Sequence, residues 1–69
     1  PREYVALTYL ADLSKSDIFY QIQESVDLEN WTTIPQSLVS TNGDSQTRRA
    51  MRQRAGEHLY LRVKILQAP

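Results

Sequence analysis

Apolar and polar residues alternate along much of this chain with a period of two, which is typical of half-buried β-strands. The alternation predicts strands over residues 4–9, 18–25 and 58–65, the last being the clearest. The apolar sides of these strands predict one core between two small sheets, formed by Val5, Leu7, Tyr9, Ile18, Tyr20, Ile22, Leu59, Leu61, Val63 and Ile65.

Shorter segments between these strands also favour an all-β chain. A short strand over residues 31–34 is expected to stop before Pro35, because proline has no N–H for a central ladder. Leu38 and Val39 either extend that strand or start it again. Ser40 to Ser45 contains Asn-Gly, a pair that readily takes positive φ, and it is the strongest turn signal in the chain.

The segment over residues 46–55 fits two structures. Its alanine, methionine, arginine and glutamine residues favour a helix, with Asp44 or Ser45 as the N-cap and Gly56 after the C-terminus. Such a helix would have Met51 as its one large hydrophobic residue, too little to hold it on a core. We therefore expect a strand, and a small antiparallel β-sandwich of about five strands, with a short helix at 45–55 as the alternative.

As a strand, this segment would separate its side chains into two sets. They are Arg49, Met51 and Gln53 on one face, and Arg48, Ala50, Arg52 and Arg54 on the other.

A polar turn joins the strand over residues 18–25 to the only tryptophan, Trp31. Asp27 and Asn30 are predicted to form this turn, because their side chains accept hydrogen bonds from backbone N–H groups one or two residues later. Leu28 is expected to dip back toward the core as a plug. Trp31 would lie across the open side of the strand pair, either as part of the core or as a surface for stacking.

Length and composition limit the class of protein. Residues 1–69 form one small domain, for which a stability of about 3–5 kcal/mol is expected. Without cysteine, the chain has no disulfide and no cysteine-based zinc or redox site. No apolar run approaches the roughly 20 residues that span a membrane. The start at Pro1 and the end at Pro69 indicate a domain cut from a larger protein.

The charges are sorted along the chain although the net charge is zero. Residues 1–34 carry two basic and six acidic side chains, and residues 35–69 carry six basic and two acidic ones. This separation predicts pairing between acidic and basic strands, which suppresses wrong registers.

The residues that carry chemistry do not predict an enzyme, a cofactor or a metal site. His58, the only histidine, falls on the outward face of its strand. Asp27, Glu29 and Asn30 offer oxygen ligands close together, but a calcium loop usually collects about six or more oxygens. Gly43 and Gly56 are the only glycines, so a glycine-rich phosphate loop is excluded.

Five residues are candidates for binding. Arg48 and Arg52 belong to an arginine-rich run that can grip phosphate or sulfated sugar. Trp31 and Tyr60 can offer flat ring faces to sugars, and Arg62 shares the face of Tyr60. Because the chain is neutral overall, we do not expect nucleic acid as a partner.

The pattern Tyr-x-Ile-x-x-Ser-x-Asp-Leu-x-x-Trp at residues 20–31, followed by Leu-Tyr-Leu-Arg-Val at 59–63, carries a resemblance. It resembles a short repeat-type module near the C-termini of large secreted proteins of Verrucomicrobia and their relatives. It also resembles the middle of a fibronectin type III domain, with Tyr9 where that family usually has tryptophan. Leu59 stands where the family has a tyrosine whose hydroxyl ties the corner of the sandwich, so that hydrogen bond is expected to be missing.

The resemblance implies a function and a location. It implies a truncated sandwich without the first and last strands, in an extracellular or cell-envelope protein of bacteria. An open edge beside residues 59–65 would then follow. We expect a non-catalytic interaction or spacer module that binds protein, or a neighbouring domain of the same chain, through a strand edge or face.

Two further partners stay open. The alternative function is a carbohydrate-binding accessory domain of a polysaccharide-degrading enzyme. A weak homodimer is also expected, in which residues 48–54 of one copy face residues 24–29 of the next.

Overall fold

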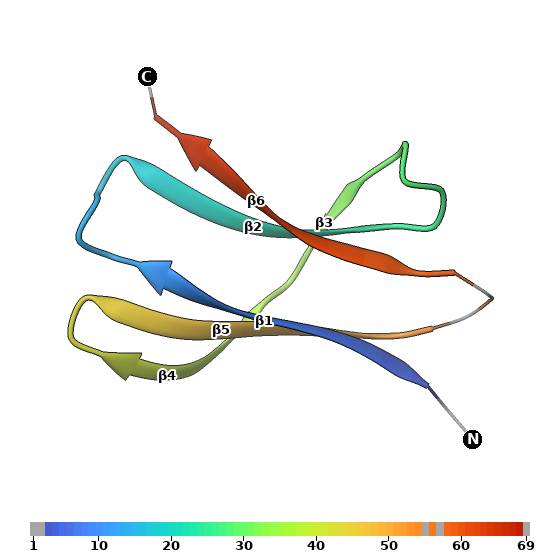
Figure 1. Ribbon diagram of the computed structural model, residues 1–69, viewed down its shortest axis with the longest axis horizontal. Coiled ribbons are helices and arrows are strands. Elements are labelled where there is room, and N and C mark those ends of the chain that lie inside the picture. The colour runs from blue at the N-terminus through green and yellow to red at the C-terminus, as the bar shows by residue number, and fades with distance from the viewer. Residues whose placement is uncertain (1–2, 55, 57, 69) are drawn as a thin grey trace.

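The computed structural model describes residues 3–54, 56 and 58–68, which form two three-stranded antiparallel sheets (Figure 1). The strands are β1 (Tyr4–Asp12), β2 (Ile18–Ser25), β3 (Thr32–Ile34), β4 (Ser37–Asn42), β5 (Ser45–Gln53) and β6 (Tyr60–Gln67). The upper sheet in Figure 1 has the order β3-β2-β6, and the lower sheet has the order β1-β5-β4. The all-β, sandwich-like fold predicted from the sequence is confirmed.

The sheets contain six strands rather than about five, because the chain changes sheet at Pro35. Ile34 pairs with Ile22 in the upper sheet, and Ser37 pairs with Arg49 in the lower sheet. Proline has no N–H to extend the β3 ladder, so the strand ends there. The Leu38–Val39 segment therefore starts a new strand instead of extending the old one.

The segment predicted as either strand or helix is β5, the middle strand of the lower sheet. The helix alternative at 45–55 is wrong, because residues 45–53 pair with β1 on one side and, in part, with β4 on the other. Pairing satisfies the backbone groups of a segment whose apolar side chains are too sparse to hold a helix. Gly43, with φ of 60°, opens the two-residue turn between β4 and β5. Ala55 of the expected turn after β5 lies outside the described residues.

The core is small and lies where the middles of the two sheets face each other. Ile22, Ile34 and Ala50 are buried together, and Leu7, Tyr9 and Leu61 pack against them. Most of the predicted core residues are at least half-buried: Val5, Leu7, Tyr9, Ile18, Tyr20, Ile22, Leu59, Leu61 and Val63.

Ile65 contradicts the predicted core, because it is 63% exposed. It pairs with Tyr20, whose ring lies 5.6 Å from the ring of Tyr9 in the other sheet, so Ile65 shares the inward face. Figure 1 shows the C-terminal half of β6 diverging from the lower sheet. The alternation therefore predicted the correct face, but no residue of the other sheet covers this end of it.

A polar contact anchors the segment that crosses between the sheets. The Tyr9 hydroxyl donates to Oε1 of Gln36, and Nε2 of the same glutamine donates to the carbonyl of Tyr20 at 3.2 Å. One side chain of the crossing segment is thereby tied to both sheets. This tie positions Pro35 and Ser37 opposite the second half of β5.

The sorted charges meet in ion pairs, as the sequence predicted. Nε of Arg52 lies 2.6 Å from Oε1 of Glu24, which joins the lower sheet to the upper one. Arg54 pairs with Glu3 at the ends of β5 and β1. Glu24 is therefore engaged within its own chain.

Candidate functional site

The five residues predicted to bind a partner fall into two groups. Trp31, Tyr60 and Arg62 belong to the outer face of the upper sheet, the face opposite Ile22. Arg48 and Arg52 project from β5 on the same side as the buried Ala50, between the sheets. The structure therefore does not bring the five residues together in one site.

A stacked contact organises the outer face of the upper sheet. The guanidinium carbon of Arg62 lies 3.9 Å from the centroid of the Trp31 ring. Nε of Arg62 donates to Oε1 of Gln23 at 2.9 Å, and Gln23 is only 8% exposed. Trp31 is half-buried against this surface and lies outside the core between the sheets. Arg62 occupies one face of the indole, which is therefore closed to a sugar ring.

Further aromatic rings continue this surface along β6. The rings of His58 and Tyr60 are stacked, with centroids 6.1 Å apart and planes inclined by 8°. Since residues two apart on a strand share a face, His58, Tyr60 and Arg62 form one row. We call His58, Tyr60, Arg62 and Trp31 the outer-face row.

The two inward arginines bind groups of their own chain. Arg48 donates from Nε and Nη2 to Oε1 of Gln46 at 3.1 and 2.8 Å. Arg52 donates to both carboxylate oxygens of Glu24, which raises the pKa of Arg52. The charge of Arg52 is neutralised by Glu24, whereas Arg48 is bonded to a neutral amide and keeps its positive charge.

The turn between β2 and β3 is built around Asp27, which accepts backbone N–H groups as expected, whereas the side chain of Asn30, also expected to accept one, donates to Asp27 instead. Oδ1 of Asp27 accepts the backbone N–H groups of Glu29 and Asn30, both at 2.9 Å, and Oδ2 accepts Nδ2 of Asn30. Ser25 Oγ donates to Asp27 and accepts the N–H of Leu28. Hydrogen bonds from the Asn30 and Glu29 backbone hold the pKa of Asp27 well below its ordinary value of 3.8.

The carboxylate of Asp27 is committed to the turn. Among residues 3–54, 56 and 58–68, no group of three or more histidine, cysteine, aspartate or glutamate side chains is arranged to hold a metal ion.

Leu28 corrects another expectation, because it does not plug the core. Its φ is 65°, and it is 56% exposed, while Val26 beside it is 68% exposed. The hydrogen bonds of Ser25 and Asp27 fix the backbone of the turn and leave both apolar side chains in solvent. We call residues 26–29 the apolar tip.

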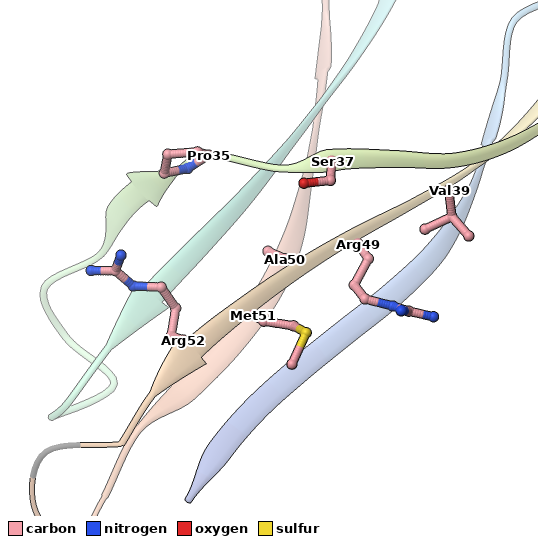
Figure 2. A pocket seen from close by; sticks show the side chains of 7 residues that line it. All are labelled: Pro35, Ser37, Val39, Arg49, Ala50, Met51 and Arg52. Carbon is pink, nitrogen blue, oxygen red and sulfur yellow. The ribbon is translucent and has the colours of Figure 1, made fainter. Parts of the chain in front are cut away.

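A hollow of about 400 Å³ lies between β5 and the segment that crosses from the upper sheet (Figure 2). It is lined by Pro35, Ser37, Val39, Arg49, Ala50, Met51 and Arg52. Pairing between β4 and β5 ends at Ser37 and Arg49, and β5 continues to Gln53 with β1 as its strand neighbour.

Sequence reasoning did not identify this hollow. The one available signal was Met51, a large hydrophobic residue on the outward face of an arginine-rich strand. The crossing of the chain at Pro35, which leaves the space open, follows only from the pairing of the strands.

The strand edges differ between the two sides of the molecule. On one side, β1 and β6 pack against each other, and each has a strand neighbour only on its other edge within the described chain. On the other side, β3 has only three residues and β4 carries a register shift between Leu38 and Ser40. The Ala68 N–H donates to the Asp17 carbonyl at 2.7 Å, so the chain up to Ala68 follows β2 and leaves the outer edge of β6 uncovered.

Within the part of the chain that the structure describes, no helix is long and apolar enough to cross a membrane. Comparison of the chain with protein-family models, with curated proteins and with solved structures gave no match.

Proposed function

We propose that this domain is a non-catalytic interaction module that binds protein by accepting a strand along the outer edge of β6. The observation that carries the proposal is the form of this edge. β6 pairs with β2 from Tyr60 to Gln67 without a register shift, and its other edge has no strand partner among the described residues. Long, regular edges of this kind recruit strands from other chains or domains.

The edge has little of the protection that isolated sheets usually carry. Proteins commonly guard such edges with charges, prolines, bulges or very short strands. β6 contains Arg62 and Lys64, but Arg62 is engaged with Gln23 and Trp31. Shortness protects β3 and a register shift protects β4, whereas β6, like β1, has neither, which supports its edge as one that can accept a strand.

The strand order is that of an immunoglobulin-like sandwich, an architecture that fibronectin type III domains share. In variable-type immunoglobulin domains, strands B, E and D are neighbours in that order in one sheet, and strands C′, C and F in the other. The orders β1-β5-β4 and β3-β2-β6 follow this scheme if β1 corresponds to the second strand. The strands without a counterpart would flank β1 and β6. In this proposal the domain belongs to a larger secreted or surface protein of bacteria, and a partner or a neighbouring domain supplies a strand.

Catalysis forms no part of the proposal. His58 is exposed on the surface and stacks on Tyr60. The carboxylates of Asp27 and Glu24 serve the turn and the ion pair described above.

Amide exchange along β6 tests the proposal. In the isolated domain, alternate amides of residues 60–67 should exchange fast, because they point away from β2. A synthetic peptide of alternating threonine and valine should slow their exchange by adding as a strand. The control is the same peptide with alternate residues N-methylated, which cannot donate to the edge. Uniformly slow exchange in the isolated domain, or no effect of the unmethylated peptide, would rule out an accessible edge.

The outer-face row favours carbohydrate binding as a second candidate function. Stacked rings such as His58 and Tyr60 offer flat surfaces of the kind on which sugar rings pack. In this case Tyr60→Ala should abolish retention on insoluble glucan, xylan or chitin without unfolding the domain, and soluble oligomers should shift the Trp31 emission. If no glycan changes the emission and Tyr60→Ala leaves retention unchanged, this candidate fails.

A further inference from the structure

The apolar tip is a rigid projection. Non-glycine residues rarely adopt positive φ, and Leu28 does so at 65° in a position that leaves its side chain in solvent. Ser25 and Asp27 hold this backbone through hydrogen bonds to Leu28, Glu29 and Asn30. Because the tip is already ordered, little conformational freedom would be lost when it binds. Unusual backbone geometry of this kind concentrates at functional sites.

The hollow beside β5 offers a receptor for apolar groups. Its volume of about 400 Å³ lies within the range of roughly 300–1,000 Å³ that is usual for binding sites. Figure 2 shows Ser37 and Val39 from β4 on one side of the hollow and Met51 from β5 on the other. Val39 and Met51 are both exposed. A methionine side chain adapts readily to an inserted apolar group.

The charges of the two surfaces are opposite. Asp27 and Glu29 belong to the apolar tip, and both are exposed. Arg49 and Arg52 line the hollow. Arg52 is neutralised by Glu24, whereas Nε of Arg49 donates to a neutral acceptor, Thr8 Oγ1, at 3.1 Å. Arg49 therefore leaves positive charge at the hollow for an acidic partner.

The tip and the hollow belong to different sheets of the chain. In Figure 1 the loop between β2 and β3 projects outward from the upper sheet, whereas β4 and β5 lie in the lower sheet. The hydrogen bonds within the turn fix this direction. A contact between the two surfaces therefore requires a second molecule.

We propose that Val26 and Leu28 of one copy of this chain dock in the hollow of a second copy, with Glu29 beside Arg49. The contact joins two different surfaces, so each pair still offers a tip at one end and a hollow at the other. Repetition of such a contact produces an open linear assembly of copies rather than a closed dimer. The outer edge of β6 takes no part in the contact, so this assembly is independent of the strand addition proposed above.

Sedimentation of the intact chain over a range of concentrations gives the first test. The weight-average mass should rise beyond that of a dimer at millimolar concentration, and less steeply at high salt, because the charges are screened. Leu28→Gly should abolish the rise in weight-average mass while leaving the domain folded, since glycine suits the positive φ of this position. Met51→Glu should do the same by placing negative charge in the hollow. Leu10→Thr, at an exposed position on β1, is the matched control and should leave the rise unchanged.

Mixing the two variants gives the decisive test. Leu28→Gly keeps an intact hollow and Met51→Glu keeps an intact tip, so the mixture should form a one-to-one pair that grows no further. Nitrogen-15-labelled Leu28→Gly protein should then show shifts at Val39 and Arg49.

Three results would overturn the inference. They are a wild-type chain that stays monomeric, self-association that survives both substitutions, and a mixture that does not pair. If the chain stays monomeric while the threonine–valine peptide still protects amides of β6, this inference fails and the proposed strand addition stands.

Discussion

Replacing Ile22 by valine tests where the core of this domain lies. Ile22 is 0% exposed, pairs with Ile34 and Val63 on either side, and is the one large side chain in the described chain that is fully buried. The substitution removes one buried methylene group, whose transfer from water is worth about 0.8 kcal/mol. With the small cavity that remains, we expect a loss of about 0.5–1.5 kcal/mol in the free energy of unfolding.

The matched control is Ile65→Val. It makes the same chemical change on the same face of the upper sheet, at a side chain that is 63% exposed. We expect the free energy of unfolding to change there by less than about 0.5 kcal/mol.

Thermal unfolding followed by circular dichroism, with urea unfolding beside it, measures both variants. For a domain of this size, a loss of 1 kcal/mol lowers Tm by roughly 4–8 °C. Ile22→Val should therefore lower Tm by several degrees, while Ile65→Val should leave it near that of the wild type. Equal losses in the two variants would refute the reasoning, because they would mean that the sheets close over Ile65 as tightly as over Ile22.

Two further predictions concern the turn and the outer face. Arg62→Ala should shift the emission of Trp31 to longer wavelength and cost at least about 0.5–1 kcal/mol of stability, because the indole loses its cation–π partner and Gln23 loses its hydrogen-bond donor. Arg62→Lys should recover the charge but not the stacking. Unchanged emission in Arg62→Ala would contradict the contact between Arg62 and Trp31. Because its pKa is lowered in the folded state, Asp27 should contribute stability that is complete above its ordinary value of 3.8 and is lost as the pH falls below it. The urea midpoint should therefore fall below that pH more steeply in the wild type than in Asp27→Asn, with Asp12, whose pKa is lowered by Ser14, accounting for part of the remaining slope.

Local features of this protein could be predicted from the sequence because their causes are local. Alternation of period two identified β1, β2 and β6 and the inward face of each, even at Ile65. The turn at Asp27 and Asn30 forms because the Asp27 carboxylate accepts backbone N–H groups two and three residues later and the side-chain amide of Asn30. The preference for a strand over a helix at 45–55 followed from the single large hydrophobic residue, Met51, on that segment, and the pairing with β1 and β4 decided it.

The arrangement of the candidate sites could not be predicted in the same way. Arg52 meets Glu24 only because β5 lies opposite β2 in the other sheet. Trp31 lies on the outer face because Arg62 and Gln23 are paired across β2 and β6, which are far apart in the sequence. The hollow beside Met51 depends on where the chain crosses between the sheets.

The sequence by itself determined the all-β character of this chain, the faces of its strands and its tightest turn. Only the tertiary structure decided which parts of those faces are covered, why Ile22 is buried while Ile65 is exposed, and which apolar groups are left for a partner. The physical reason is that alternation reports the direction of a side chain relative to its own strand. Burial depends on the second sheet, whose position is set by pairings between residues distant in the sequence.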